Sequence, residues 1–117
     1  MDDPFDHIRA RFSRLYEPYI SIGKGWYPLL LELDAELTAI DPDLRYAQIK
    51  EKWAELRVYV TSDSAVVRAA IHRAEAKSRV TCESCGAVGS IHQHGSWYRT
   101  LCESCAAETN YVPYQGR

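Results

Sequence analysis

Four cysteines, grouped in two pairs in the last third of the chain, constrain the fold more than any other feature. Each pair lies in a Cys-Glu-Ser-Cys segment, and sixteen residues separate Cys85 from Cys102. Two thiolates two residues apart can bind one ion from a single tight turn, and two such turns supply the four sulfurs of a tetrahedral site. The spacing is typical of structural zinc. The sequence therefore predicts one structural Zn²⁺ ion bound by Cys82, Cys85, Cys102 and Cys105.

The residue that follows each pair bears on the geometry of its turn. Gly86 follows the first pair, and a metal-binding turn needs a residue there that tolerates a positive φ angle. Ala106 follows the second pair, so we expect that turn to be less regular. Three other uses of four cysteines stay open but are weaker: a disulfide framework, a redox pair and an iron–sulfur centre. A disulfide framework suits a secreted chain, a redox pair needs a single Cys-x-x-Cys, and an iron–sulfur centre usually has uneven cysteine spacings.

Two histidines, His92 and His94, lie between the cysteine pairs. A closed site of four thiolates needs neither as a ligand, and it leaves no open position for Lewis-acid catalysis. We therefore expect both to be exposed loop residues. The alternative, a catalytic pair beside the zinc as in a nuclease, stays open.

Composition and charge exclude several other classes of protein. Of the 117 residues, 46% are hydrophobic and 26% are charged, and the net charge is −2. That charge argues against a general nucleic-acid coat and against a polybasic membrane binder. The most hydrophobic run, residues 26–31, is too short to span a bilayer, and the acidic N-terminus is unlike a signal peptide. We expect a cytoplasmic protein with no membrane partner.

Hydrophobic spacing predicts three helices, over residues 4–16, 27–40 and 65–77. Proline or a short polar residue stands at each start, as helix N-termini favour. The predicted buried residues are Phe5, Ile8, Phe12 and Leu15 in the first helix, Leu30, Leu33, Leu37 and Ile40 in the second, and Val67, Ala70, Ile71 and Ala74 in the third.

Residues 44–60 fit either a helix or a β-hairpin. Four apolar positions have helical spacing, but residues 56–61 alternate and are rich in β-branched and aromatic side chains. We predict a hairpin with strands over about 46–52 and 55–61 and a turn at Trp53-Ala54. The expected fold class is α+β, with three helices, a small β-hairpin and a C-terminal four-cysteine zinc-ribbon or knuckle module. The expected parts are 1–79, a zinc module at 80–109 and a flexible tail at 110–117.

The basic side chains are concentrated in the middle of the chain. Residues 44–79 hold eight basic and four acidic residues, whereas residues 1–43 hold four basic and nine acidic ones. This stretch either packs beside the acidic helices or forms a partner site. The candidate partner surface is Lys50, Lys52, Trp53, Arg57 and Tyr59. Each tryptophan (Trp26, Trp53 and Trp97) is expected to pack in the core, with an anchor at an interface as the alternative.

Five blocks of residues together resemble a family of small proteins encoded by bacteriophages and prophages. The blocks are Gly23-x-Gly25-Trp26 with the Leu30, Leu33 and Leu37 stripe, Gln48-Ile49-Lys50-Glu51-Lys52-Trp53-Ala54-x-Leu56-Arg57-x-Tyr59, Ala74-Glu75-x-x-Ser78, Cys82-Glu83-x-Cys85-Gly86-x-x-Gly89 and Trp97-x-x-Thr100-Leu101-Cys102-x-x-Cys105. The similarity covers about residues 23–105. The family usually reads KEKFGxLR, and this chain has Ala54 at the glycine position. The resemblance implies a phage or prophage origin and a four-cysteine zinc site, and it implies no particular activity.

Three functions are compatible with these features. The favoured one is a non-enzymatic, zinc-stabilised accessory protein that binds a host macromolecule, in particular a protein. The second is a nucleic-acid-binding zinc ribbon that uses Arg45, Lys50, Lys52, Arg57, Arg68, Arg73, Lys77 and Arg79. The third is a diverged nuclease, because residues 101–105 resemble the end of metal-stapled HNH nucleases. The sixteen residues between the pairs contain no Asn or Asp, which disfavours the nuclease. The sequence does not indicate an oligomeric state.

Overall fold

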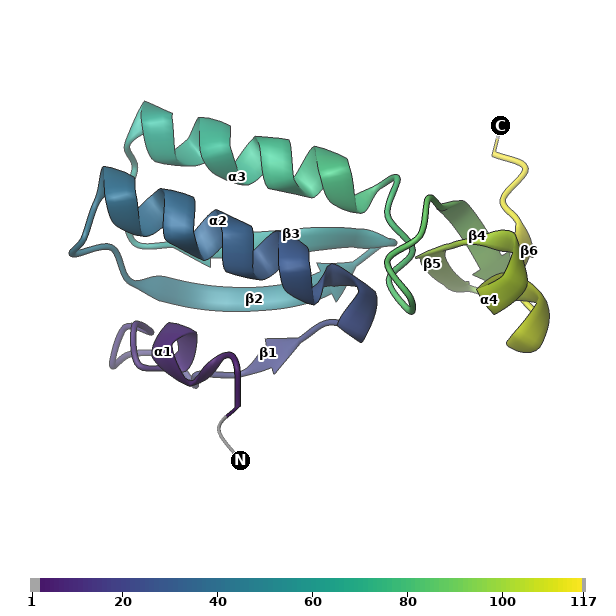
Figure 1. Ribbon diagram of the computed structural model, residues 1–117, viewed down its shortest axis with the longest axis horizontal. Coiled ribbons are helices and arrows are strands. Elements are labelled where there is room, and N and C mark those ends of the chain that lie inside the picture. Colours follow the sequence, from purple (N-terminus) through teal and green to yellow (C-terminus); the bar gives the residue numbers. More distant parts are fainter. Residues whose placement is uncertain (1–2, 117) are drawn as a thin grey trace.

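The computed structural model describes residues 3–116, which form an α+β fold with two small sheets (Figure 1). The larger part contains α1 (Asp6–Arg9), β1 (Ile20–Ser21), the 3-10 turn η1 (Lys24–Trp26), α2 (Tyr27–Ile40), β2 (Tyr46–Lys52), β3 (Glu55–Val60) and α3 (Ala65–Ser78). The smaller part contains all four cysteines, with β4 (Ser90–His94), β5 (Trp97–Leu101), α4 (Glu103–Glu108) and β6 (Val112–Pro113). Within residues 3–116, no helix has the length and hydrophobicity needed to cross a membrane.

The first sheet forms one layer, and helices α2 and α3 form a second layer that covers one of its faces. Its strand order is β1-β2-β3, with β1 parallel to β2 and β3 antiparallel to it. Ile49 and Val58 are cross-strand partners, and both belong to the main core together with residues of α2 and α3 (Figure 1). Because side chains alternate along a strand, their neighbours Lys50 and Arg57 lie on the opposite face. The predicted hairpin and the α2 and α3 helices are confirmed.

The turn of the hairpin has an unusual backbone. Trp53 and Ala54 have φ angles of 54° and 67°, a conformation that usually requires glycine in a two-residue turn. Two contacts hold Ala54 there. The Oε2 atom of Glu51 accepts a hydrogen bond from the Ala54 amide at 2.8 Å, and the Thr100 hydroxyl donates one to the Ala54 carbonyl at 2.7 Å. Ala54 therefore adopts a conformation typical of glycine, supported by a hydrogen bond from Thr100 on β5.

The prediction of a first helix over residues 4–16 is wrong. Only four residues form α1, and the chain then runs beside β2, where Phe12 and Tyr46 form a parallel bridge. The Tyr46 amide donates to the Arg11 carbonyl, and the Ser13 amide donates to the Tyr46 carbonyl. The Arg11 carbonyl and the Ser13 amide thus bond to β2 and not to helical partners, so the helix does not continue. Leu15, predicted to be buried, is 86% exposed.

A buried carboxylate on α2, which the sequence analysis missed, fixes this N-terminal segment. The Tyr46 hydroxyl donates a hydrogen bond of 2.6 Å to Asp34, which also lies 3.3 Å from His7 Nε2 and 3.5 Å from Arg11 Nε. Burial, together with the neighbouring Asp34 carboxylate, raises the pKa of Tyr46 well above its ordinary value. The network joins α2, β2 and the segment around α1.

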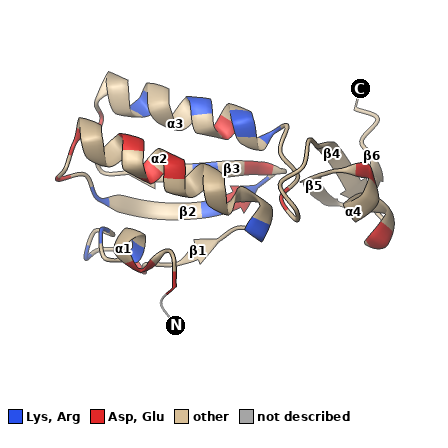
Figure 2. Ribbon diagram, viewed as in Figure 1, with Lys and Arg blue, Asp and Glu red and all other residues tan. Residues whose placement is uncertain are grey.

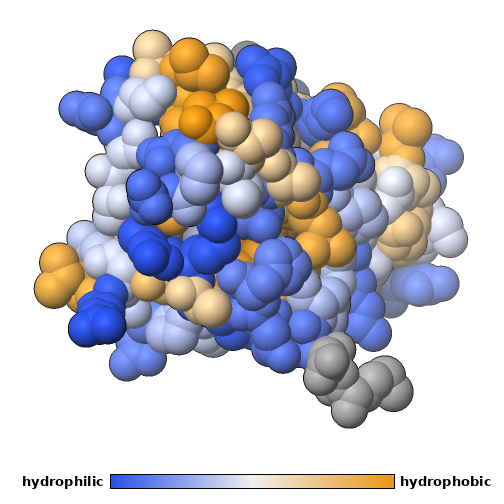
Figure 3. Space-filling view, turned by 60° about the vertical axis from the view of Figure 1, so that its left-hand side comes forward, coloured by the Kyte–Doolittle hydropathy of each residue, from blue (hydrophilic) through white to orange (hydrophobic). Residues whose placement is uncertain are grey.

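The basic α3 helix lies beside the acidic α2 helix, and an ion pair joins Arg73 to Glu36 (Figure 2). Part of the basic stretch is thus matched within the chain. On the face shown in Figure 3, hydrophobic residues occur in several small groups separated by hydrophilic ones. Nothing on that face resembles one large apolar interface.

The C-terminal part adds two elements that the sequence analysis did not predict. A fourth α-helix, α4, begins at the second cysteine pair, so residues 3–116 contain four α-helices instead of three. Within the predicted tail at 110–117, β6 pairs with β4, and the Tyr114 amide donates to the Ile91 carbonyl. The second sheet therefore has the order β5-β4-β6.

Candidate metal centre

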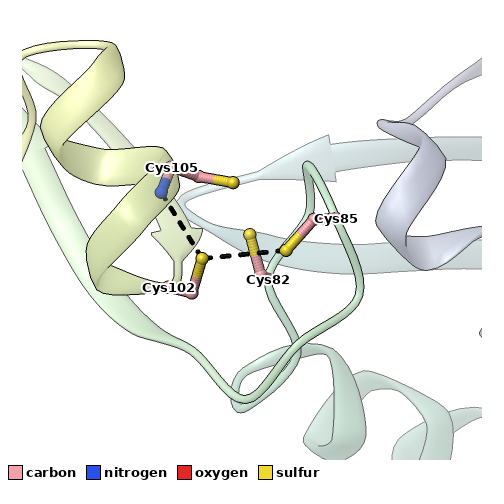
Figure 4. Close-up of side chains that lie close together, drawn as sticks. All are labelled: Cys82, Cys85, Cys102 and Cys105. Atoms are coloured by element: carbon pink, nitrogen blue, oxygen red, sulfur yellow. Dashed lines mark hydrogen bonds between the residues drawn. The ribbon is translucent and has the colours of Figure 1, made fainter.

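The two cysteine pairs, far apart in sequence, meet at one point (Figure 4). The sulfur atoms of Cys82, Cys85, Cys102 and Cys105 all lie within 4.8 Å of one another, and the Cys85 and Cys102 sulfurs are 3.7 Å apart. A tetrahedral ion with Zn–S bonds of about 2.3 Å separates its sulfurs by about 3.8 Å. All four are free cysteines. The cluster could therefore hold one metal ion.

The first pair lies in a closed turn after α3. The Cys82 amide donates to the Ala87 carbonyl at 2.7 Å, and the Gly86 amide donates to the Cys82 carbonyl at 2.9 Å. Gly86 has a φ angle of 86°, as the sequence analysis expected for this position. The glycine lets the backbone reverse directly after Cys85, so both sulfurs of the pair face the second pair.

The second pair is held by a helix instead of a second such turn. Cys102 is the N-cap of α4, Cys105 lies in its first turn, and the Cys105 amide donates to the Cys102 sulfur at 3.4 Å. Ala106 is an ordinary helical residue, which is why this pair needs no glycine. Along the chain, the four-cysteine part consists of the first cysteine turn, the β4–β5 hairpin and α4. The two halves of the site are therefore not equivalent.

The thiols influence one another strongly. Burial of Cys82 opposes its ionisation, but hydrogen bonds from the amides of Cys102, Cys85 and Ser84 outweigh burial and lower its pKa to about 6. The hydrogen bond with the Cys102 side chain, together with burial, raises the pKa of Cys105 to about 12. Without a metal, these interactions favour ionisation of Cys82 and oppose ionisation of Cys105. A divalent cation would offset the accumulated negative charge.

Residues 23–26, the glycine segment, pack directly on the first cysteine turn. The Gly25 amide donates to the Glu83 carbonyl at 2.7 Å, and the buried Trp26 indole donates to the Thr81 carbonyl at 2.8 Å. A Cβ atom on Gly25 would lie 2.6 Å from the Gly86 nitrogen, and still closer to the Cys82 carbonyl oxygen. Only glycine therefore allows this approach, which fixes the position of the turn.

Glu83, inside the first cysteine pair, is a buried carboxylate that the sequence analysis did not single out. Its Oε2 atom accepts a hydrogen bond from the Gly23 amide at 2.9 Å, and its Oε1 atom lies 3.6 Å from Arg99 Nε. Burial raises the pKa of Glu83. The side chain thus joins the glycine segment, the cysteine turn and β5. A Glu within a Cys-x-x-Cys segment gives no sequence signal for this role.

The two histidines lie on β4 and not in a loop. His92 is buried, with Nδ1 2.8 Å from the Ser90 carbonyl oxygen, which corrects the expectation that it is exposed. His94 is exposed, and its ring centroid is 5.5 Å from that of Tyr111. Among residues 3–116, the four cysteines form the only group of three or more potential ligands. The histidines do not join it.

The expectation that every tryptophan packs in the core is correct only for Trp26. Trp53 is 64% exposed and Trp97 is 71% exposed. Trp53 lies at the tip of the β2–β3 turn, and its ring centroid is 5.5 Å from that of Tyr98 on β5. These two tryptophans therefore belong to the surface where the two parts of the molecule meet.

The candidate partner residues lie mainly on the uncovered face of the first sheet. Lys50 and Arg57 are direct cross-strand partners, and Tyr59 pairs with Gln48 on the same face. Lys52 pairs with Glu55 farther along, and Trp53 lies at the turn. A groove of about 790 Å³ runs along β2, and Lys50 and Tyr59 line it together with the exposed Tyr16 and Tyr19.

Comparison with known proteins gives no match: no family model fits the sequence, and no curated protein or solved structure is significantly similar to it.

Proposed function

We propose that this chain is a non-enzymatic binding protein in which one structural Zn²⁺ ion holds the C-terminal part against the α+β core. The proposed partner is a protein with an acidic surface, bound on the uncovered face of the first sheet. The single observation that carries the proposal is the position of Lys50 and Arg57, directly opposite each other on that face.

The zinc assignment rests on the chemistry of the donor set. A set of four cysteine sulfurs within 4.8 Å of one another suits structural zinc, and four thiolates would fill all four positions of a tetrahedral ion. Such an ion would stabilise the turn and α4 without binding a substrate. The fold supports this role, because the cysteine turn connects to the core through Gly25, Trp26 and Glu83.

The partner assignment rests on charge. Like charges directly opposite on two strands destabilise a sheet, unless an anionic group lies between them. Arg57 also pairs with Glu55, at 2.8 Å, and its Nε atom, unpaired among the described residues, is buried, so a partner would contact the terminal nitrogens of the guanidinium group. A carboxylate of a partner protein would bridge Lys50 and Arg57, and Tyr59 would add an aromatic contact.

The resemblance to phage-encoded proteins makes a host protein, in the host cytoplasm, the expected partner. A nucleic acid is the alternative, because exposed tyrosines beside basic side chains also suit single strands. Both partners would be anionic, so the experiment must separate them by more than salt dependence.

The test compares two double variants that remove the same charge from different faces. Lys50→Gln with Arg57→Gln neutralises the sheet face, and Arg68→Gln with Lys77→Gln neutralises exposed positions on α3. The zinc-loaded proteins are immobilised and exposed to nuclease-treated bacterial lysate, and retained proteins are identified by mass spectrometry. We expect wild type and the α3 variant to retain the same proteins, and the sheet-face variant to lose them.

Two results would contradict the proposal. Equal retention by both double variants would show that the sheet face is not the binding surface. Loss of all binding on nuclease treatment, with direct binding of a single-stranded oligonucleotide that weakens steeply with salt, would assign the face to nucleic acid instead.

A further inference from the structure

A second surface lies where the β2–β3 turn meets the tip of the β4–β5 hairpin. Glu51, Trp53, Trp97 and Tyr98 line a pocket of about 200 Å³ there. A groove of about 460 Å³ continues from it, lined by Glu51, Glu83, Trp97, Tyr98, Arg99 and Tyr111. The pocket therefore combines aromatic side chains with the Glu51 carboxylate.

The Glu51 carboxylate has no cationic partner among residues 3–116. Its Oε2 atom accepts the Ala54 amide, but no Lys, Arg or His forms an ion pair with it in residues 3–116. It is half-buried beside two tryptophans whose exposure exceeds 60%. Exposed tryptophans are typical of binding hot spots, and aromatic faces attract cations.

The neighbouring groove shows how such a set of residues holds a cation. There, Arg99 lies 3.6 Å from Glu83 through its Nε atom, and its guanidinium carbon is 5.9 Å from the centre of the Tyr111 ring. A carboxylate and an aromatic ring thus bind one arginine of the chain itself. Glu51, with Trp53, Trp97 and Tyr98, offers the same chemistry, and no cation from the described part of the chain pairs with it.

The geometry points to a binding site for an arginine side chain of a partner protein, formed by Glu51, Trp53, Trp97 and Tyr98. A planar guanidinium can stack on an indole and donate to a carboxylate at the same time, which an ammonium group does less well. This site has the opposite charge preference to the sheet face. This inference does not depend on binding at the sheet face.

The site also gives the hairpin turn a function. Trp53 occupies a left-handed position, with φ 54°, and the hydrogen bonds to Ala54 fix the turn. The indole is consequently presented at a defined place and not on a mobile loop. A rigid aromatic wall loses little conformational entropy when a guanidinium packs against it.

The test is an NMR titration of the zinc-loaded protein, with N-acetyl-arginine amide as the probe. N-acetyl-citrulline amide, which has nearly the same shape and no charge, is the matched control. We expect the probe to shift the indole N–H signals of Trp53 and Trp97. The indole of Trp26 donates to Thr81 in the core, so its signal should not move and serves as an internal reference.

Two variants test the contribution of the carboxylate. In Glu51→Gln the amide oxygen can still accept the Ala54 amide, so the turn is retained while the charge is removed. Affinity for the probe should fall about threefold or more. Glu108→Gln, at an exposed position on α4, removes the same charge elsewhere and should leave affinity unchanged. Trp97→Ala should also weaken binding, and since Trp97 is mostly exposed, this variant should remain folded.

Three outcomes would overturn the inference: equal shifts with the citrulline probe, unchanged affinity in Glu51→Gln, or no shift of either surface indole. None of them bears on the sheet-face variants, so failure here is distinguishable from failure of the proposed function.

Discussion

Replacing Gly25 with alanine would put a methyl group into the backbone of the first cysteine turn. The added Cβ would lie 2.6 Å from the Gly86 nitrogen and 2.7 Å from the Glu83 carbonyl carbon. These neighbours are backbone atoms, which cannot rotate away as a side chain would. The glycine segment and the cysteine turn must therefore move apart by several tenths of an ångström at least.

The cost can be worked out from the contacts that this movement disturbs. Overpacking at a tight site costs about 1–3 kcal/mol. Lengthening the 2.7 Å hydrogen bond between the Gly25 amide and the Glu83 carbonyl adds about 1 kcal/mol. If the indole of Trp26 also loses Thr81, an unpaired buried donor adds about 1–3 kcal/mol. We expect Gly25→Ala to reduce the free energy of unfolding by about 2–4 kcal/mol, or by about 3–7 kcal/mol if the Trp26 hydrogen bond is also lost. Either loss is a large share of the total for a domain of this size.

Gly95 provides the control, because it lies at the tip of the β4–β5 hairpin with nothing within 4 Å of its added Cβ. Its φ angle of 63° means that Gly95→Ala measures conformational strain alone, about 1–2 kcal/mol. Urea unfolding of both zinc-loaded variants, followed by circular dichroism, gives the two free energies. If Gly25→Ala costs no more than Gly95→Ala, the glycine segment does not hold the cysteine turn.

Three further predictions follow from the structure. A strong chelator should unfold residues 80–116 and expose all four thiols to alkylation, since structural zinc contributes about 10–16 kcal/mol at neutral pH; unchanged far-ultraviolet circular dichroism and thiols that stay protected would contradict the metal assignment. Because burial raises the pKa of Tyr46 above its ordinary value of 10.0, the unfolded chain loses this proton first as pH rises. Stability should therefore fall above pH 10, and Tyr46→Phe should flatten that slope in urea titrations. Leu15→Ser should leave the midpoint of urea unfolding unchanged, whereas Ile8→Ala, in the core, should cost about 2–5 kcal/mol; a large loss for Leu15→Ser would restore the predicted long first helix.

The elements that the sequence predicted well are those whose signals are local. Pro28 near the start of α2, the Ser64 cap of α3 and the apolar stripes of both helices act within a few residues. The alternation over residues 55–60 likewise specifies a strand. The cysteine spacing predicted which sulfurs meet, because the two pairs share one short module. In each case the determining residues are neighbours in the chain.

The errors come from contacts between distant segments. The stripe Phe5, Ile8 and Phe12 is buried as predicted, but a bridge to Tyr46 on β2, and not a helix, buries Phe12. A spacing of three or four residues does not distinguish these two structures. Asp34 gave no signal either, because its partners lie 12 residues or more away in sequence. Trp53 and Trp97 were assigned to the core by residue type, although both lie at hairpin tips.

Several residues of the blocks that carry the resemblance lie where the two parts of the molecule meet. Gly25 and Trp26 contact the first cysteine turn, and the Thr100 hydroxyl donates to the Ala54 carbonyl. Within the larger part, the Leu56 amide donates to the Ser78 Oγ atom. The contacts of Gly25, Trp26 and Thr100 join the four-cysteine part to the larger part of the molecule. The same blocks also contain residues of both proposed binding sites: Lys50, Arg57 and Tyr59 on the sheet face, and Glu51, Trp53 and Trp97 at the aromatic pocket. Substitutions at Lys50, Arg57 and Tyr59 on the sheet face leave the contacts between the two parts in place, so they should separate a loss of binding from a loss of the fold.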